Sequence, residues 1–174
     1  YEAFDRENQE LVALKVLRQG HFHTVERLRR EFNALNGVEH PNLVKLGEFM
    51  ESGEDCFFSM ELIKGVDFLE YVKADVNGPK RWRYDEKRLR DTLVQIVFGL
   101  NIIHQEGKVH RDVKPSNIMV TEEGRVVILD FGLVTDEEST YENHARAYAA
   151  VGTVAYMSPE QAAMKPLSPA TDWY

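Results

Sequence analysis

The sequence predicts an α+β fold in two parts, a small β-rich part followed by a larger α-rich part. Three short apolar runs typical of strands, together with one helical stripe, account for most of the first sixty positions. A long helical period then runs from Asp85 to about Gln105. Between them, at Lys64-Gly65, the pattern changes from strand to helix, so we expect the parts to span residues 1–64 and 65–174.

The first part is expected to contain three strands, each a short apolar run, over residues 11–17, 43–50 and 55–61. One helix is expected between the first two strands, over about residues 23–35, because apolar side chains recur there on a helical stripe. Asn36-Gly37 fits the left-handed end of that helix.

The long helix of the second part has a clear start and end. Asp85 suits the N-cap, and Gly107 fits the position just after the last turn. A short helix is expected before it, over residues 68–72, and two strands after it, over residues 118–121 and 126–129.

Composition limits the class of protein. A formal net charge of −8 argues against a general binder of nucleic acid or anionic membranes, which need a positive field. The single cysteine, Cys56, cannot form an internal disulfide, which favours a reducing compartment and a cytoplasmic location. No apolar run is long enough to cross a bilayer. Because the chain lacks an initiating Met and stops abruptly at Tyr174, we expect a fragment that is incomplete at both ends.

The most informative stretch is His110-Arg111-Asp112-Val113-Lys114-Pro115-Ser116-Asn117, followed thirteen residues after Asn117 by Asp130-Phe131-Gly132. An Asn and an Asp can bind Mg²⁺ through oxygen, and an Asp five residues before the Asn can accept the proton of an attacking hydroxyl. Phosphoryl transfer from ATP needs this combination of groups.

These motifs resemble those of the protein kinases. The resemblance implies a two-lobed fold, with a partial β-rich lobe over 1–64 and a partial α-rich lobe over 65–174. It implies that Asp112 is the catalytic base, with Lys114 beside it, and that Asn117 and Asp130 bind Mg²⁺, with Mn²⁺ as an alternative ion.

The resemblance also implies a nucleotide site. Lys15 matches the strand lysine that holds the α and β phosphates of ATP, and it has two candidate helix partners, Glu26 and Glu31. Glu31 fits better, because the glutamate of the family lies about ten residues before a proline that corresponds to Pro41. The implied adenine and ribose contacts are Ala13, Met60 as gatekeeper, Glu61 to Ile63 as hinge, Asp67 and Met119.

Lys114 and Thr153 favour serine/threonine over tyrosine as the substrate class. Tyr156-Met157-Ser158-Pro159-Glu160-Gln161 is similar to the corresponding segment of prokaryotic-type kinases. Asp172 matches the residue that braces the catalytic loop. The implied column that stabilises the active state is formed by Leu35, Leu46, His110 and Phe131.

The sequence departs from the family pattern in three places. The Gly-rich loop over the phosphates and the later helices of the large lobe are missing, so we expect the fragment alone to fold poorly and to transfer little phosphate. Residues 145–150 contain no Ser or Thr where many relatives carry an activating phosphate.

Three functions remain open. The leading one is a protein serine/threonine kinase that uses ATP and acts on protein substrates, with regulatory or membrane domains outside this fragment. The second is a pseudokinase, which the joint presence of Lys15, Glu31, Asp112, Asn117 and Asp130 disfavours. The third is a small-molecule kinase, which the peptide-docking segment from Thr153 to Glu160 disfavours.

Overall fold

The computed structural model describes residues 1–17, 25, 29, 32–33, 36–52, 55–73, 84–130, 135–136 and 153–174. Its strands are β1 (Glu2–Asp5), β2 (Glu10–Leu17), β3 (Leu46–Ser52), β4 (Asp55–Glu61), β5 (Gly65–Asp67), β6 (Lys108–Val109), β7 (Ile118–Thr121), β8 (Val126–Ile128) and β9 (Thr135–Asp136). Its helices are α2 (Phe68–Val72), α3 (Glu86–Gln105) and α5 (Pro159–Ala162), and its 3₁₀ helices are η1 (Pro115–Asn117), η2 (Thr153–Tyr156) and η3 (Pro169–Trp173).

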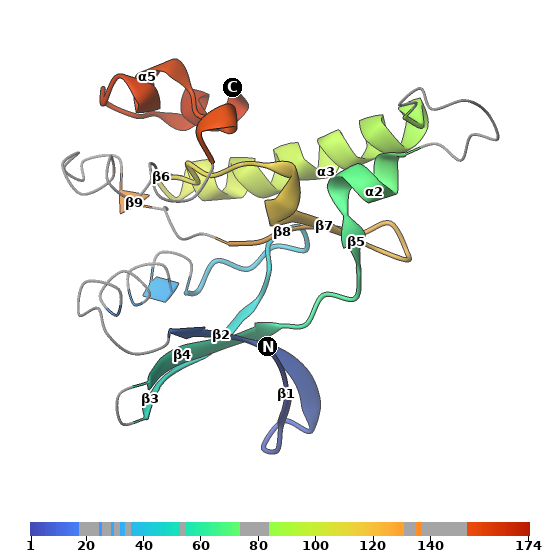
Figure 1. Cartoon of the computed structure of the whole chain (residues 1–174), viewed down its shortest axis with the longest axis vertical. Coiled ribbons are helices and arrows are strands. Elements are labelled where there is room, and N and C mark those ends of the chain that lie inside the picture. The colour runs from blue at the N-terminus through green and yellow to red at the C-terminus, as the bar shows by residue number, and fades with distance from the viewer. Residues whose placement is uncertain are drawn as a thin grey trace.

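The first sheet has four antiparallel strands in the order β1-β2-β4-β3 and lies at one end of the molecule (Figure 1). In its register Ala13 pairs with Met60, and Lys15 pairs with Phe58. Because side chains alternate between the two faces of a sheet, these four residues share one face. Phe32, from the segment where a helix was predicted, packs on Phe58 with ring centroids 5.6 Å apart.

The second part is built around α3, which lies across the small sheet β5-β7-β8 (Figure 1). Asp85 caps α3, since its Oδ1 accepts a hydrogen bond from the backbone N–H of Arg88 at 2.9 Å. Gly107, just past the end of α3, has a φ of +67°, in the left-handed region where glycine pays no steric penalty. The predicted start and end of this helix are confirmed.

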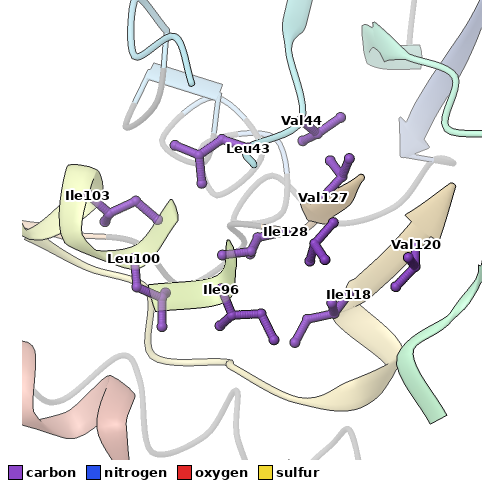
Figure 2. Close-up of a cluster of buried hydrophobic side chains, with 10 residues drawn as sticks. Leu43, Val44, Ile96, Leu100, Ile103, Ile118, Val120, Val127 and Ile128 are labelled. Carbon is purple, nitrogen blue, oxygen red and sulfur yellow. The ribbon is translucent and has the colours of Figure 1, made fainter. Parts of the chain in front are cut away.

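The main core lies between α3 and the small sheet (Figure 2). Its buried side chains come from α3, β7, β8 and the segment before β3, and they are Leu43, Val44, Ile96, Leu100, Ile103, Ile118, Val120, Val126, Val127 and Ile128. Close approach at Gly99 of α3 permits this packing: a Cβ there would lie 2.9 Å from Cδ1 of Ile128 and 3.2 Å from the carbonyl oxygen of Asn42.

The strand predicted over residues 43–50 begins later, at Leu46, and this correction has a physical cause. Leu43 forms an isolated parallel bridge with Ile128. The N–H of Val44 donates to the Ile128 carbonyl at 3.1 Å, and the N–H of Ile128 donates to the Asn42 carbonyl at 2.9 Å. Residues 42–44, which precede β3, are therefore bonded through their backbone to β8 and do not belong to the four-stranded sheet.

The strand predicted over residues 126–129 ends one residue earlier, at Ile128, because the N–H of Leu129 donates to the carbonyl of Asn117 at 2.7 Å. The strands β1, β5, β6 and β9 were not predicted. Within the ranges given above, no helix combines the length and the apolar character needed to cross a membrane.

Candidate active site

The loop from His110 to Asn117 is held by Asp172, a residue of η3 that is far away in the sequence. The side chain of Asp172 is fully buried. Its Oδ2 accepts the N–H of His110 at 2.8 Å, and its Oδ1 accepts the N–H of Arg111 at 2.7 Å. Arg111 has a φ of +69°, an uncommon conformation for a residue with a side chain, so it needs such support. The predicted brace is confirmed.

His110 is fully buried and also holds this loop in place through its ring nitrogens. Its Nδ1 lies 3.2 Å from the N–H of Asp112, which donates to it, and its Nε2 lies 3.3 Å from the carbonyl oxygen of Leu129. These partners fit the neutral Nε2–H tautomer. Burial lowers the pKa of His110, and this effect outweighs the nearby carboxylate of Asp172, which raises it.

Among the described residues, one carboxylate oxygen of Asp112 accepts hydrogen bonds from side chains, and the other does not. Its Oδ2 accepts hydrogen bonds from Lys114 Nζ at 2.8 Å and from Asn117 Nδ2 at 3.0 Å. Its Oδ1 is buried and receives no hydrogen bond from the part of the chain that the structure describes. A buried acceptor without a donor costs about 1–3 kcal/mol, so this atom is suited to receive an incoming donor such as a hydroxyl group.

Asn117 and Asp130 lie at one cavity. Asn117 donates through Nδ2 to the carbonyl of Asp112 at 2.9 Å, so its amide oxygen Oδ1 is not used in this hydrogen bond. Asp130 follows Leu129, whose N–H is bonded to Asn117, and Asp130 Oδ1 accepts a hydrogen bond from Lys15 Nζ. The ion pair joins β2 of the first sheet to the segment after β8.

The cavity has a volume of about 210 Å³ and brings together residues from both parts of the chain. Its lining consists of Lys15, Val44, Leu46, Phe58, Met60, Ser116, Asn117, Leu129 and Asp130. An amide oxygen and a carboxylate at its wall are hard oxygen donors, which Mg²⁺ prefers. The residues present therefore fit a magnesium ion, with the remaining ligand positions left for phosphate and water.

Of the residues predicted to contact adenine, Met60 lines this cavity. Ala13 and Met60 are cross-strand neighbours, so they lie side by side on the face that carries Lys15. Ile63 is half-buried and packs against the main core. Met119 lies on the opposite face of β7 from the buried Ile118 and Val120, as its half-buried position in an alternating pattern indicates.

Two other predicted nucleotide residues have clear structural partners. Asp67 caps α2, with its Oδ1 accepting the N–H of Glu70 at 2.9 Å. Glu61 uses its N–H to bond the carbonyl of Lys45 at 2.8 Å. Its carboxylate forms a two-pronged ion pair with Arg125, at 2.6 and 2.8 Å, and the hydrogen bonds from Arg125 lower the pKa of Glu61.

Several sequence predictions lie outside the described residues. They concern the two candidate partners of Lys15, the aromatic residue after Asp130 and one member of the proposed column, namely Glu26, Glu31, Phe131 and Leu35. Thr153 is described only by its place in η2. The roles assigned to these residues stay predictions.

Sequence reasoning missed two contacts at the site. Arg125 joins Glu61 and also donates through Nε to the carbonyl of Pro41 at 2.8 Å. Gln161 donates to the carbonyl of Arg111 at 2.8 Å. The spacing of Ser158 and Gln161 does signal a capping box, which the structure contains, but nothing local signals the contact with Arg111.

Comparison with known proteins finds protein kinases, both by family model and by individual relatives. A model of the protein kinase domain matches residues 1–174. The chain is 35% identical over 154 residues to the serine/threonine-protein kinase PrkC of Bacillus subtilis, a match that covers 87% of this chain and 22% of that protein. It is 32% identical over 170 residues to a probable serine/threonine-protein kinase of Corynebacterium efficiens, covering 94% of this chain and 25% of that protein.

A plant protein, CBL-interacting protein kinase 12 of Oryza sativa subsp. japonica, is 34% identical over 166 residues, covering 92% of this chain and 29% of that protein. The chain therefore spans less than a third of the length of each of these three relatives.

Proposed function

This chain belongs to the protein kinase family, and from that premise we propose that the protein carrying it transfers the γ-phosphate of ATP to serine or threonine hydroxyls of protein substrates. We propose residues 1–64 as part of the small lobe and residues 65–174 as part of the large lobe. Three relatives named as kinases, two of them as serine/threonine kinases, support the activity.

The observation that carries the proposal is the buried Oδ1 of Asp112, which receives no hydrogen bond from the described residues. Lys114 and Asn117 hold Oδ2 and so fix the direction of Oδ1. In the proposed reaction the substrate hydroxyl donates its hydrogen bond to Oδ1, and its oxygen forms a bond to the γ-phosphorus while the bond to the ADP oxygen breaks. The hydroxyl proton passes to Asp112, which orients the hydroxyl more than it abstracts the proton early.

Lys15 lines the cavity, and we propose that its positive charge holds the α and β phosphates. Asn117 and Asp130 are proposed to hold magnesium, which neutralises phosphate charge when bound. The pair of Lys15 with Glu31, the adenine contacts Ala13, Met60, Glu61, Ile63 and Met119, and the ribose contact Asp67 are part of the same proposal.

Residues 1–174 alone are proposed to transfer little phosphate. In the described residues, α3 keeps a group of large apolar side chains about half exposed to solvent, namely Leu93, Val94, Val97 and Phe98. Large apolar side chains exposed together on one helix are a liability for a chain that must stay folded and soluble. Activity measurements therefore belong on the protein that contains this chain.

The test is the substitution Asp112→Asn, assayed with Mg-ATP and a generic protein substrate. We expect turnover to fall by about 10²–10⁴-fold, while the affinity for ATP stays unchanged because Asp112 contacts the hydroxyl and not the nucleotide. The matched control is Asp91→Asn, which changes an exposed carboxylate on α3.

Three outcomes count against the proposal. Equal turnover by Asp112→Asn and by the control removes the assigned base. Binding of Mg-ATP without transfer to protein supports the pseudokinase instead. Transfer to small hydroxyl compounds but not to protein supports the small-molecule kinase.

A further inference from the structure

The carbonyl of Arg111 is bonded by a side chain fifty positions away. Gln161 Nε2 donates to it at 2.8 Å, and Gln161 is 8% exposed. The backbone N–H of Arg111 donates to Asp172 Oδ1 at 2.7 Å. Arg111, with its φ of +69°, is thus held on both sides, and Asp112 is the next residue. A left-handed residue persists only where its surroundings fix it.

The amide of Gln161 has a fixed orientation. Its Oε1 accepts the N–H of Ser158 at 2.9 Å, and its own N–H donates to Ser158 Oγ at 3.4 Å, which together form the capping box of α5. The oxygen is therefore committed to Ser158, and the nitrogen faces the Arg111 carbonyl. The position requires one acceptor and one donor at the end of the same side chain.

The carbonyl of Arg111 belongs to the peptide group that leads directly into Asp112. Rotation of this peptide group would move the Asp112 carboxylate, whose Oδ2 is bonded to Lys114 and Asn117. A misplacement of about 1 Å in a reacting group is enough to lower a rate about 100-fold.

We infer that Gln161 is a positioning residue for Asp112: it fixes the Arg111 peptide and so links α5 to the catalytic loop. The inference rests on the proposed kinase function. Gln161 touches neither the substrate hydroxyl nor the cavity that we assign to the nucleotide. Its loss is therefore expected to lower kcat and to leave the KM for ATP nearly unchanged.

The main test is Gln161→Glu in the protein that carries this chain. The ionised side chain has no donor, so an anionic oxygen would face the Arg111 carbonyl. We expect kcat to fall about tenfold or more at about pH 8, with the KM for ATP within about twofold of the unsubstituted protein. Burial and the facing Arg111 carbonyl should raise the pKa of the introduced carboxyl, so at about pH 6 part of it is protonated and can donate again, and the ratio of kcat to that of the unsubstituted protein should recover in part.

Two further variants make the test specific. Gln161→Met keeps a similar volume but has no donor at any pH, so its kcat ratio should stay low at both pH values. Gln105→Glu makes the same chemical change at an exposed position on α3 and should match the unsubstituted protein throughout.

The outcomes separate the two claims. If the unsubstituted protein transfers no phosphate, the proposed function fails. If it does, and Asp112→Asn is inactive while Gln161→Glu keeps its kcat, only the positioning role fails. Loss of nucleotide binding in both Gln161 variants also overturns the inference, because it shows a role in folding. Equal kcat ratios for Gln161→Glu at the two pH values overturn it as well.

Discussion

Substitution of Asp172 by Asn tests how the catalytic loop is held. Asp172 Oδ1 serves one backbone donor, on Arg111, whereas Oδ2 serves the N–H of His110 and lies 2.7 Å from His104 Nε2. An Asn side chain has one oxygen and one NH₂ group, so it loses fewest bonds when the oxygen takes the Oδ2 position. The NH₂ group then faces the N–H of Arg111, and two donors oppose each other.

The magnitude follows from these contacts. A hydrogen bond to a charged group contributes about 1.5–3 kcal/mol, and a buried donor left without a partner costs about 1–3 kcal/mol. The Asp172 side chain is fully buried, so water cannot replace the lost acceptor. We therefore expect Asp172→Asn to lower the free energy of unfolding by about 2–4 kcal/mol. Turnover should fall too, because Arg111 loses a hydrogen bond that helps to fix its conformation.

The assay is urea unfolding of the protein that carries the chain, followed by tryptophan fluorescence. Trp173 packs edge-on against His104, with ring centroids 5.3 Å apart, and so reports on this region. The control, Asp91→Asn, alters an exposed carboxylate that is screened by solvent, and it should leave the unfolding midpoint unchanged. A loss below about 1 kcal/mol for Asp172→Asn would refute the reasoning.

Two further predictions concern titratable groups. Burial lowers the pKa of His110, so below about pH 6.5 the unfolded chain binds a proton that the folded chain does not, and stability should fall as the pH falls. Urea midpoints at about pH 7.5 and about pH 5.5 test this, and His110→Phe should reduce the difference; an unchanged midpoint in the unsubstituted protein contradicts it. The ion pair of Glu61 with Arg125 is partly exposed, so a double-mutant cycle with Glu61→Gln and Arg125→Met should give a coupling of about 1 kcal/mol after allowance for solvent screening. Because Arg125 lowers the pKa of Glu61, this coupling should be present above about pH 4.3 and be lost as the pH falls through the lowered pKa, and a coupling that is independent of pH in this range argues against it.

Local signals in the sequence predicted α3 well. Asp85 and Gly107 mark its two ends through capping and left-handed geometry, which depend only on neighbouring residues. Prediction failed where a distant segment competed for backbone groups. Leu43 and Val44 look like the start of a strand, but their backbone groups are bonded to β8.

The candidate site shows the same division. The motif around Asp112 and Asn117 predicts phosphoryl transfer, and in the structure the Asn117 side chain donates a hydrogen bond to the Asp112 carboxylate at 3.0 Å. Lys15 was expected to pair with Glu31, which lies outside the described residues, and in the described residues it forms an ion pair with Asp130. No local pattern in the sequence could reveal that contact, because the two residues are 115 positions apart.

The sequence by itself determined which candidate groups for the proposed phosphoryl transfer are present, since residue type and short spacing define a motif. The tertiary structure alone decided how those groups are held. Asp172 and Gln161 reach the two sides of Arg111 from 61 and 50 positions away, and burial alone lowers the pKa of His110 against the effect of nearby carboxylates. These effects depend on which atoms meet in a low-dielectric interior, and that is settled only when the chain has packed.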